Sequence, residues 1–199
     1  MKKPATTDFP IHEILTERWS PRAFRSDLVD REQLGSLFEA ARWGASCFNA
    51  QPWHFLVATR DDEAGYAKLA SCLADANAVW ATKAPVLVVA IAAQNFAHNG
   101  KPNRHALHDV GLALGNLTVQ AQALGLSVHQ MAGFDADKAR QVCAIPDGFE
   151  PVAMAAIGYR GDPQGLPEPL RARESAPRER RPLAEFVFGA TWNSASPIG

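Results

Sequence analysis

The stretch APVLVVAIAA, residues 84–93, decides the fold of this protein. It is rich in valine and isoleucine, and a short apolar run of this kind is typical of a strand that is buried on both faces. The run is about half as long as the roughly 20 residues that a membrane-spanning helix needs, so it does not predict a membrane span. We therefore expect a central strand in a sheet that is flanked by helices.

Other segments predict the remaining strands and the helices. The strands are expected in WHFLVATR at 53–60, LSVHQMA at 126–132 and EPVAMAAIGY at 150–159, and LAEFVF at 183–188 could add one more. Apolar periodicity and capping residues predict helices at about 10–17, 30–43, 62–73, 105–124 and 135–143. Because the strands stand at wide spacing between helices, the predicted class is α+β with a central mixed or antiparallel sheet.

The segment HALHDVGLALGNLTVQAQAL, residues 105–124, predicts the longest helix of the chain. It is apolar or small on most sides, and Gly125 is suited to end it. A helix with this pattern is expected to be buried all round. In a chain of 199 residues, such burial indicates that a partner subunit covers one side of the helix.

Length and charge bound the organisation of the chain. Its 199 residues suit one domain, 1–199. Residues 160–182 hold five prolines and six arginines with no helical period, which predicts an extended C-terminal arm over 160–199. The formal net charge of −1 gives no global field for nucleic acid or an anionic membrane. No apolar stretch follows the two N-terminal lysines, so we expect no secretory signal and a cytoplasmic protein.

The stretch ERWSPRAF, which begins at Glu17, carries hydrogen-bond donors at alternate positions: Arg18, Ser20 and Arg22. In an extended loop, side chains two positions apart point to the same side. Arginine forks and a serine hydroxyl suit the oxygens of a phosphate group. The alternative is that the two arginines lie at the surface and pair with Glu17 and Asp27.

A second basic group lies in the C-terminal arm, at Arg178, Arg180 and Arg181. These residues could join the first group to clamp a phosphate dianion. The arm could instead be a module that binds nucleic acid, but Glu174 and Glu179 are interleaved with its arginines and argue against this.

Two further stretches carry groups that could contact a flat ligand. In FNAQPWHF, the amides of Asn49 and Gln51 both donate and accept hydrogen bonds, just before a predicted strand. In QMAGFD, the small residues Ala132 and Gly133 would let backbone N–H groups approach a ligand closely. The alternatives are a hydrogen-bonded turn and a tight strand-to-helix connection, respectively.

Neither a metal site nor a nucleophilic site is predicted. His105 and His108 lie one turn apart on a helix and could share a metal, but spacing fixes no third ligand at His98 or Asp109. We expect these residues to line a polar cleft or to face solvent. The chain has no GxGxxG, GxxxxGK[ST] or GxSxG, so the common phosphate loops and the nucleophile elbow are excluded.

Taken in order along the chain, R-W-S-P-R-A-F, N-A-Q-P-W-H-F, G-L-x-x-x-x-M-A-G-F and R-x-R-R-P-L resemble the motifs of the FMN-dependent nitroreductase family. The resemblance covers about residues 10–188. It implies an α+β fold in an intertwined homodimer, with exchanged C-terminal arms and FMN at the dimer interface. The long helix at 105–124 matches the family's central dimer helix.

The resemblance also implies which residues contact FMN. The phosphate and ribityl contacts map to Arg18, Trp19, Ser20, Arg22 and Arg180; the asparagine that reaches the flavin, usually from the partner subunit, maps to Asn49, with Gln51 beside it; the residues near the reactive flavin nitrogen map to Met131, Ala132 and Gly133.

The implied activity is hydride transfer from NAD(P)H through flavin N5 to a nitroaromatic or quinone acceptor, with ping-pong kinetics. The flavin carries this chemistry, so no catalytic side chain is expected. Relatives perform dehalogenation, oxidation and flavin breakdown, and a protein that stores or senses FMN without turnover is another alternative. Two departures bear on the substrate: Ala132 stands where some members have glutamate, and the stretch between 93 and 105 is too short for a larger helical lid.

Overall fold

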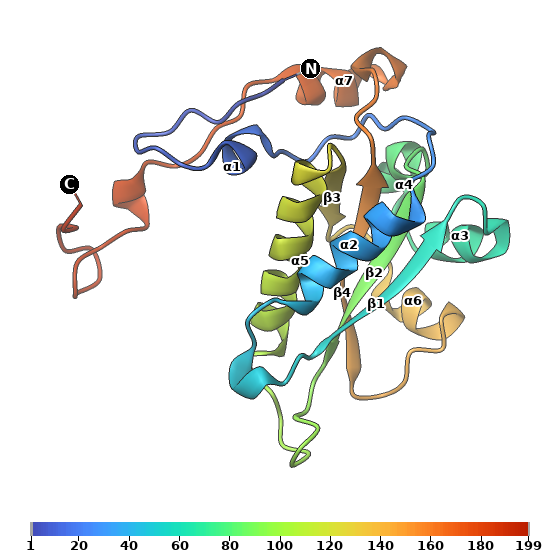
Figure 1. The fold of residues 1–199 in the computed structure, drawn as a ribbon, viewed down its shortest axis with the longest axis horizontal. Helices are drawn as coiled ribbons and strands as arrows, with labels where there is room; N and C mark the ends of the chain where they lie inside the picture. Colours follow the sequence, from blue (N-terminus) through green and yellow to red (C-terminus); the bar gives the residue numbers. More distant parts are fainter. Residues whose placement is uncertain (1, 199) are drawn as a thin grey trace.

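A computed structural model of the protein describes residues 2–198, whose strands form an antiparallel sheet with helices on both faces (Figure 1). The strands are β1 (Trp53–Thr59), β2 (Val86–Ala93), β3 (Ser127–Met131) and β4 (Phe149–Gly158). Their order in the sheet is β1-β2-β4-β3, and each neighbouring pair is antiparallel. The predicted α+β class and the four principal strands are therefore confirmed.

The helices lie between and beyond these strands. They are α1 (Glu13–Glu17), α2 (Arg31–Arg42), α3 (Glu63–Ala70), α4 (Asp75–Ala81), α5 (Ala106–Ala123), α6 (Ala136–Val142) and α7 (Glu168–Ser175), with short 3-10 turns at Cys47–Asn49, Pro163–Gly165 and Leu183–Glu185. Asp30, Asp62 and Asp135 cap α2, α3 and α6 through side-chain oxygens that accept from backbone N–H groups of the first turn. Within residues 2–198, none of these helices is long and apolar enough to cross a membrane.

Strand β2 is buried because its alternate residues face two different layers of helices. Leu87, Val89 and Ile91 belong to a cluster that includes residues of α3, α4 and α6. Val86 and Val88 belong to a second cluster, with residues of α2 and α5. Successive side chains of a strand point to opposite faces, so an entirely apolar run requires a covering layer on each side.

Within the single chain, helix α5 is buried on one side, and its other side is the one that a partner subunit is expected to cover. Ala113, Leu117 and Ala121 are fully buried against the sheet and α2. The opposite side is exposed at Leu107, His108, Gly111, Leu112, Gly115 and Asn116. Among residues 2–198, no atom outside the neighbouring residues and the helix's own backbone lies within 4 Å of a Cβ built at either of the two glycines of this face. The face is therefore open to close approach by another surface.

The C-terminal arm is not extended throughout, which corrects the prediction of an extended arm. Helix α7 interrupts it, with Pro169 in the first helical turn, where a proline is tolerated. The stretch LAEFVF begins with the 3-10 turn Leu183–Glu185 and belongs to no strand of the described residues, so the further strand is wrong.

The two ends of the chain run side by side, away from the sheet (Figure 1). Arg178 Nη1 in the C-terminal arm donates to the carbonyl oxygens of Lys3 (2.7 Å) and Thr16 (2.8 Å). Lys3 Nζ donates in turn to the carbonyl oxygen of Glu174 at 2.7 Å. The arms are thus joined mainly by polar groups, in contrast to the apolar core.

Candidate functional site

The loop of Arg18–Phe24 is held by a buried carboxylate from the C-terminal arm. Glu174 of α7 is 1% exposed and accepts hydrogen bonds from the backbone N–H groups of Arg22 (2.8 Å) and Ala23 (3.0 Å). The Arg22 guanidinium lies 3.9 Å from the same carboxylate. Sequence reasoning missed this contact because the two partners are 152 positions apart.

The alternative in which Arg18 and Arg22 pair with Glu17 and Asp27 is not what the structure shows. Glu17 pairs with Lys2 at 2.8 Å, and Asp27 pairs with Arg25 at 3.0 Å. Arg22 therefore faces Glu174, and Arg18 is left for another partner.

Three guanidinium groups gather where the first motif meets the C-terminal arm: Arg18, Arg178 and Arg180. Burial lowers the pKa of Arg18, and the positive charge of Arg180 lowers it further. Burial likewise lowers the pKa of Arg178, and the positive charges of Arg18 and Arg180 lower it further. Among residues 2–198 none of the three is ion-paired with a carboxylate. Because arginine stays protonated in proteins, the cluster is a concentrated positive charge that an anion would relieve.

Trp19 follows Arg18 in the same loop. It is 8% exposed, and its ring carries Lys3 Nζ at 4.6 Å and the Arg160 guanidinium at 6.0 Å from the ring centroid. Its indole Nε1 is buried and has no partner among the described residues. The hydroxyl of Ser20, one position on, makes no hydrogen bond within residues 2–198. Of these two donors, the partly exposed Ser20 hydroxyl is the one left available, two positions from Arg18.

The same loop lies beside β3, the edge strand that leads to Ala132 and Gly133 in the stretch QMAGFD. His129 Nδ1, in the middle of β3, donates to the carbonyl oxygen of Pro21 at 2.8 Å. The imidazole also packs on Trp80, with ring centroids 4.4 Å apart. Burial lowers the pKa of His129 to about 4, so the ring is neutral at pH 7, and its Nδ1 must carry the proton because a carbonyl only accepts.

Strand β3 ends at Met131, and the exposed residues Ala132 and Gly133 follow it. The Gly133 carbonyl accepts from Asn77 Nδ2 (2.9 Å) and from the N–H of Ala74 (3.2 Å). A Cβ at Gly133 would lie 2.6 Å from Asn77 Nδ2, so a larger residue here would displace the Asn77 side chain. Neither Ala132 nor Gly133 donates its N–H to a carbonyl in a turn or loop of the described residues.

The stretch with Asn49 and Gln51 forms a strained loop. Phe48, Asn49 and Gln51 have φ angles of 53°, 54° and 47°, in the left-handed region that residues other than glycine rarely adopt. Such conformations persist only where surrounding contacts hold them, and they cluster at functional sites. One contact comes from α5: the buried Asp109 Oδ2 accepts from the N–H of Cys47 at 2.9 Å.

Within one chain, the two predicted ends of the site are far apart. The Asn49 loop is bonded to Asp109 in the first turn of α5, whereas Arg160, which lies over Trp19, bonds Gln122 in the last turn at 3.0 Å. At about 1.5 Å per residue, α5 separates these points by roughly 20 Å. The structure therefore gathers the first motif, Arg180 and the edge of β3, and leaves Asn49 and Gln51 at the other end.

The histidines of the polar loop lie near the Asn49 end. The rings of Phe96 and His98 lie 6.0 Å and 6.5 Å from that of Phe48, and His105 and His108 are 6.5 Å apart. Within the described residues no group of three potential ligands is placed to hold a metal ion.

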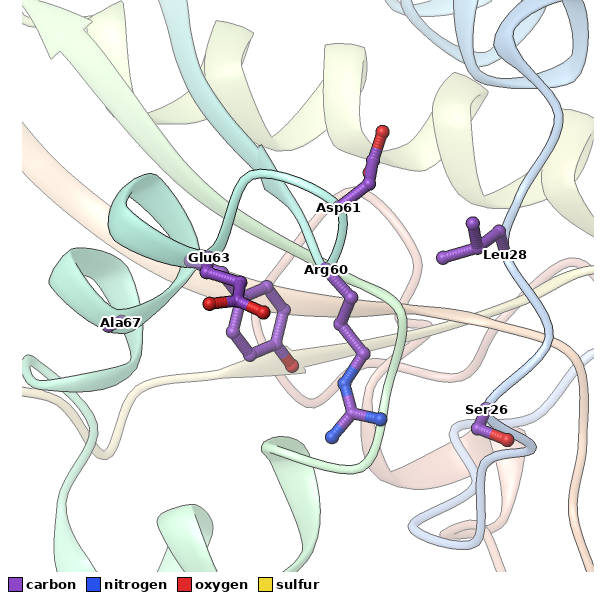
Figure 2. A pocket seen from close by; sticks show the side chains of 7 residues that line it. Ser26, Leu28, Arg60, Asp61, Glu63 and Ala67 are labelled. Carbon is purple, nitrogen blue, oxygen red and sulfur yellow. The ribbon is translucent and has the colours of Figure 1, made fainter.

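A hollow of about 490 Å³ lies elsewhere, between the loop at Ser26 and Leu28 and the start of α3 (Figure 2). Two of its polar groups already have partners: Arg60 donates to the carbonyl oxygen of Thr82 at 2.8 Å, and Tyr66 donates to that of Ala84 at 2.5 Å. None of the predicted site residues lines it.

The fold is that of an α+β protein whose first motif packs beside β3, the edge strand of an antiparallel sheet. The chain belongs to the nitroreductase family, whose sequence pattern its residues 15–159 match. This confirms the resemblance seen in the sequence motifs.

Individual relatives agree with this assignment. A crystal structure described as an oxidoreductase containing FMN is 35% identical, with a TM-score of 0.91 over 95% of this chain and 96% of the other. A 15.4 kDa uncharacterized protein of Mycolicibacterium smegmatis is 32% identical over 70% of this chain and 97% of its own length. The NADH dehydrogenase of Thermus thermophilus is 27% identical over 86% of this chain and 92% of its own length.

Proposed function

We propose that the protein is an FMN-dependent oxidoreductase, which passes hydride from NAD(P)H to a nitroaromatic or quinone acceptor with ping-pong kinetics. The observation that carries the proposal is the cluster of Arg18, Arg178 and Arg180 without paired carboxylates. It suits a phosphate dianion, and the edge strand β3 leads from it to an exposed turn with small residues. The name of the similar FMN-containing oxidoreductase supports the same cofactor.

The residues of the cluster would hold the phosphate end of FMN. Arg18 and Arg180 would supply charge-assisted hydrogen bonds, and Ser20 would add its free hydroxyl. Trp19 would contribute backbone, as the family resemblance implies. Arg22 would contribute mainly its place in the loop, because its guanidinium already faces Glu174 at 3.9 Å.

The turn after β3 would face the reactive part of the ring. When bound, FMN supplies the hydride-accepting and electron-donating chemistry, so the chain needs no acid or base of its own. The N–H groups of Ala132 and Gly133 would stabilise negative charge on the ring, and the buried Met131 would fix the end of the strand. The small side chains leave the ring face open to a planar acceptor.

We further propose that the functional unit is a homodimer with FMN at the interface. Asn49 and Gln51 lie roughly 20 Å from the phosphate end of their own chain, measured along α5, so they would reach the flavin ring of the partner subunit. The exposed face of α5, with Leu107 and Leu112 at 50% and 40% exposure, offers an apolar surface for such a partner. Sedimentation should then give about twice the 21.5 kDa chain mass; a flavin-loaded monomer would contradict the dimer.

The visible absorption spectrum of the purified protein tests the function. A flavin spectrum that bleaches with anaerobic NADH or NADPH is the expected result. A flavin spectrum that neither nicotinamide bleaches would instead favour storage, sensing or another flavin reaction, and Ala132 in place of an acidic residue is the feature that would fit. A protein that cannot be reconstituted with FMN would contradict the proposal.

A further inference from the structure

We propose that Asp109 is a positioning residue of the flavin site, which it serves by fixing the strained loop that presents Asn49 and Gln51. The inference rests on the proposed function and goes beyond it, because Asp109 is not itself expected to touch FMN. It starts from a buried carboxylate, 2% exposed, that is used neither in the sheet nor in the phosphate cluster.

The position of Asp109 explains how a buried carboxylate is tolerated. It lies in the first turn of α5, where the helix dipole favours negative charge. Its two oxygens have separate partners: Oδ2 accepts from the N–H of Cys47 at 2.9 Å, and Oδ1 lies 3.0 Å from Nδ1 of His108. The contact with His108 lies at the surface, whereas the bond to Cys47 connects α5 to the loop.

The loop on which Asp109 acts is closed at both ends. At its start, Asp109 holds the N–H of Cys47; at its end, the hydroxyl oxygen of Ser46 accepts from the N–H of Gln51 at 3.1 Å. Between these two bonds lie the left-handed residues Phe48 and Asn49. A bond from a carboxylate to a backbone N–H is charge-assisted, and is therefore suited to hold a conformation that the chain disfavours.

The segment before the loop also rests on α5. A Cβ built at Gly44 would lie 3.0 Å from the Cα of Ala113, one turn along the helix from Asp109. The backbone therefore approaches the helix closely at Gly44 and is bonded to it at Cys47. Because α5 also carries the exposed face proposed for the dimer, Asp109 would set the loop relative to the surface across which Asn49 must reach.

The experiment compares Asp109→Ala and Asp109→Asn with two controls. Asn keeps an oxygen that can accept from Cys47, whereas Ala keeps none. Tyr66→Phe removes a buried hydrogen bond on the opposite face of the sheet, and so controls for lost stability alone. His108→Ala removes the other partner of Asp109 and leaves the bond to Cys47 in place.

The first readout is hydrogen exchange in the loop of the FMN-free protein. We expect Asp109→Ala to speed exchange of the Cys47 amide strongly, and Asp109→Asn, His108→Ala and Tyr66→Phe to leave it close to the parent rate. Unchanged exchange in Asp109→Ala would overturn the proposed contact, whether or not the protein binds a flavin.

The second readout is the rate of flavin reduction by saturating NAD(P)H. Asp109→Ala should slow it by up to about 100-fold, as expected when a group near the reacting centre is displaced by about 1 Å. Asp109→Asn should recover most of the rate. Tyr66→Phe should reduce the flavin at the parent rate even if it loses as much stability as Asp109→Ala does. Faster amide exchange with an unchanged reduction rate would overturn the positioning role of Asp109 but not its contact with Cys47. A parent protein that binds no FMN would overturn the proposed function.

Discussion

The sheet and the two chain ends are held together by different forces. In the sheet, β2 is apolar throughout and is covered on both faces by helices of the same chain. In the arms, the contacts are polar: Arg178 and Lys3 bond backbone carbonyls, and Glu174 bonds backbone N–H groups. Three guanidiniums nearby have no carboxylate partner in the described part of the chain.

The difference shows which interactions are satisfied within one chain and which require a ligand or a second surface. Apolar burial in the sheet is satisfied within one chain, so that region should fold without help. The arms concentrate positive charge and leave aromatic groups exposed, with Phe186 at 49% and Trp192 at 80%. An anion and a second surface would supply what they lack. Variants of the sheet should therefore change unfolding, and variants of the arms should change ligand binding.

The largest effect is expected at Trp80, in the core on one face of the sheet. Trp80→Ala should lower the free energy of unfolding by about 3–5 kcal/mol, because it leaves a large cavity at a side chain that is 1% exposed. Denaturant unfolding followed by circular dichroism measures this loss. Val79→Ala, at a neighbour that is 53% exposed, is the matched control and should change little. Equal losses in both would break the contrast.

Acid should weaken the junction between the two regions, where His129 meets the loop at Pro21. Its pKa of about 4 in the folded state lies below the unfolded value of 6.5, so the unfolded state binds more protons between these pH values. Stability therefore falls as the pH drops from 6.5 towards 4, by about 3 kcal/mol at most.

The histidine contribution can be isolated by substitution. His129→Phe should flatten the stability profile between pH 6.5 and 4, measured by denaturant unfolding at several pH values. His98→Gln, at an exposed histidine, should leave the profile unchanged. A profile that keeps its full slope without His129 would assign the acid sensitivity to other groups.

In the arm region, Arg18→Ala should weaken FMN binding by about 1.5–3 kcal/mol, as expected for one charge-assisted hydrogen bond. Riboflavin, which lacks the phosphate, should bind the variant and the parent alike. Fluorescence titration with both flavins measures the difference. Arg173→Ala, at an exposed arginine of α7, is the control. Parallel losses for the two flavins would remove the phosphate from the assignment.

The smallest effect is expected at the start of α2. Asp30 Oδ1 accepts from the N–H of Glu32 at 2.7 Å, so Asp30→Ala should cost about 1 kcal/mol of stability. Asp27→Ala, which loses only an exposed pair with Arg25, should cost less. Thermal unfolding of the two variants measures this difference. FMN binding should be unchanged in both, because α2 packs on the sheet and not on the arms.

Sequence patterns were sufficient for elements with strong periodicity or clear caps. The strand at 84–93 and the helix at 105–124 were predicted within a few residues. They were less informative where periodicity is short: the helix expected at 62–73 ends at Ala70, and α4 follows as a separate helix that was not predicted. Helix α7 was missed because its arginines and proline show no apolar face; its fully buried residue is the charged Glu174, and only Leu170 adds a partly buried apolar contact with the core.

The sequence by itself determined the class of fold, the family and the types of residue available for an anion and a flat ligand, because these depend on local order along the chain. Only the tertiary structure decided that Arg22 faces Glu174, that Arg18 meets Arg178 and Arg180, and that Asp109 holds the loop before β1. These contacts join residues that are 62 to about 160 positions apart, and no local pattern encodes which of many possible charged partners the fold brings together.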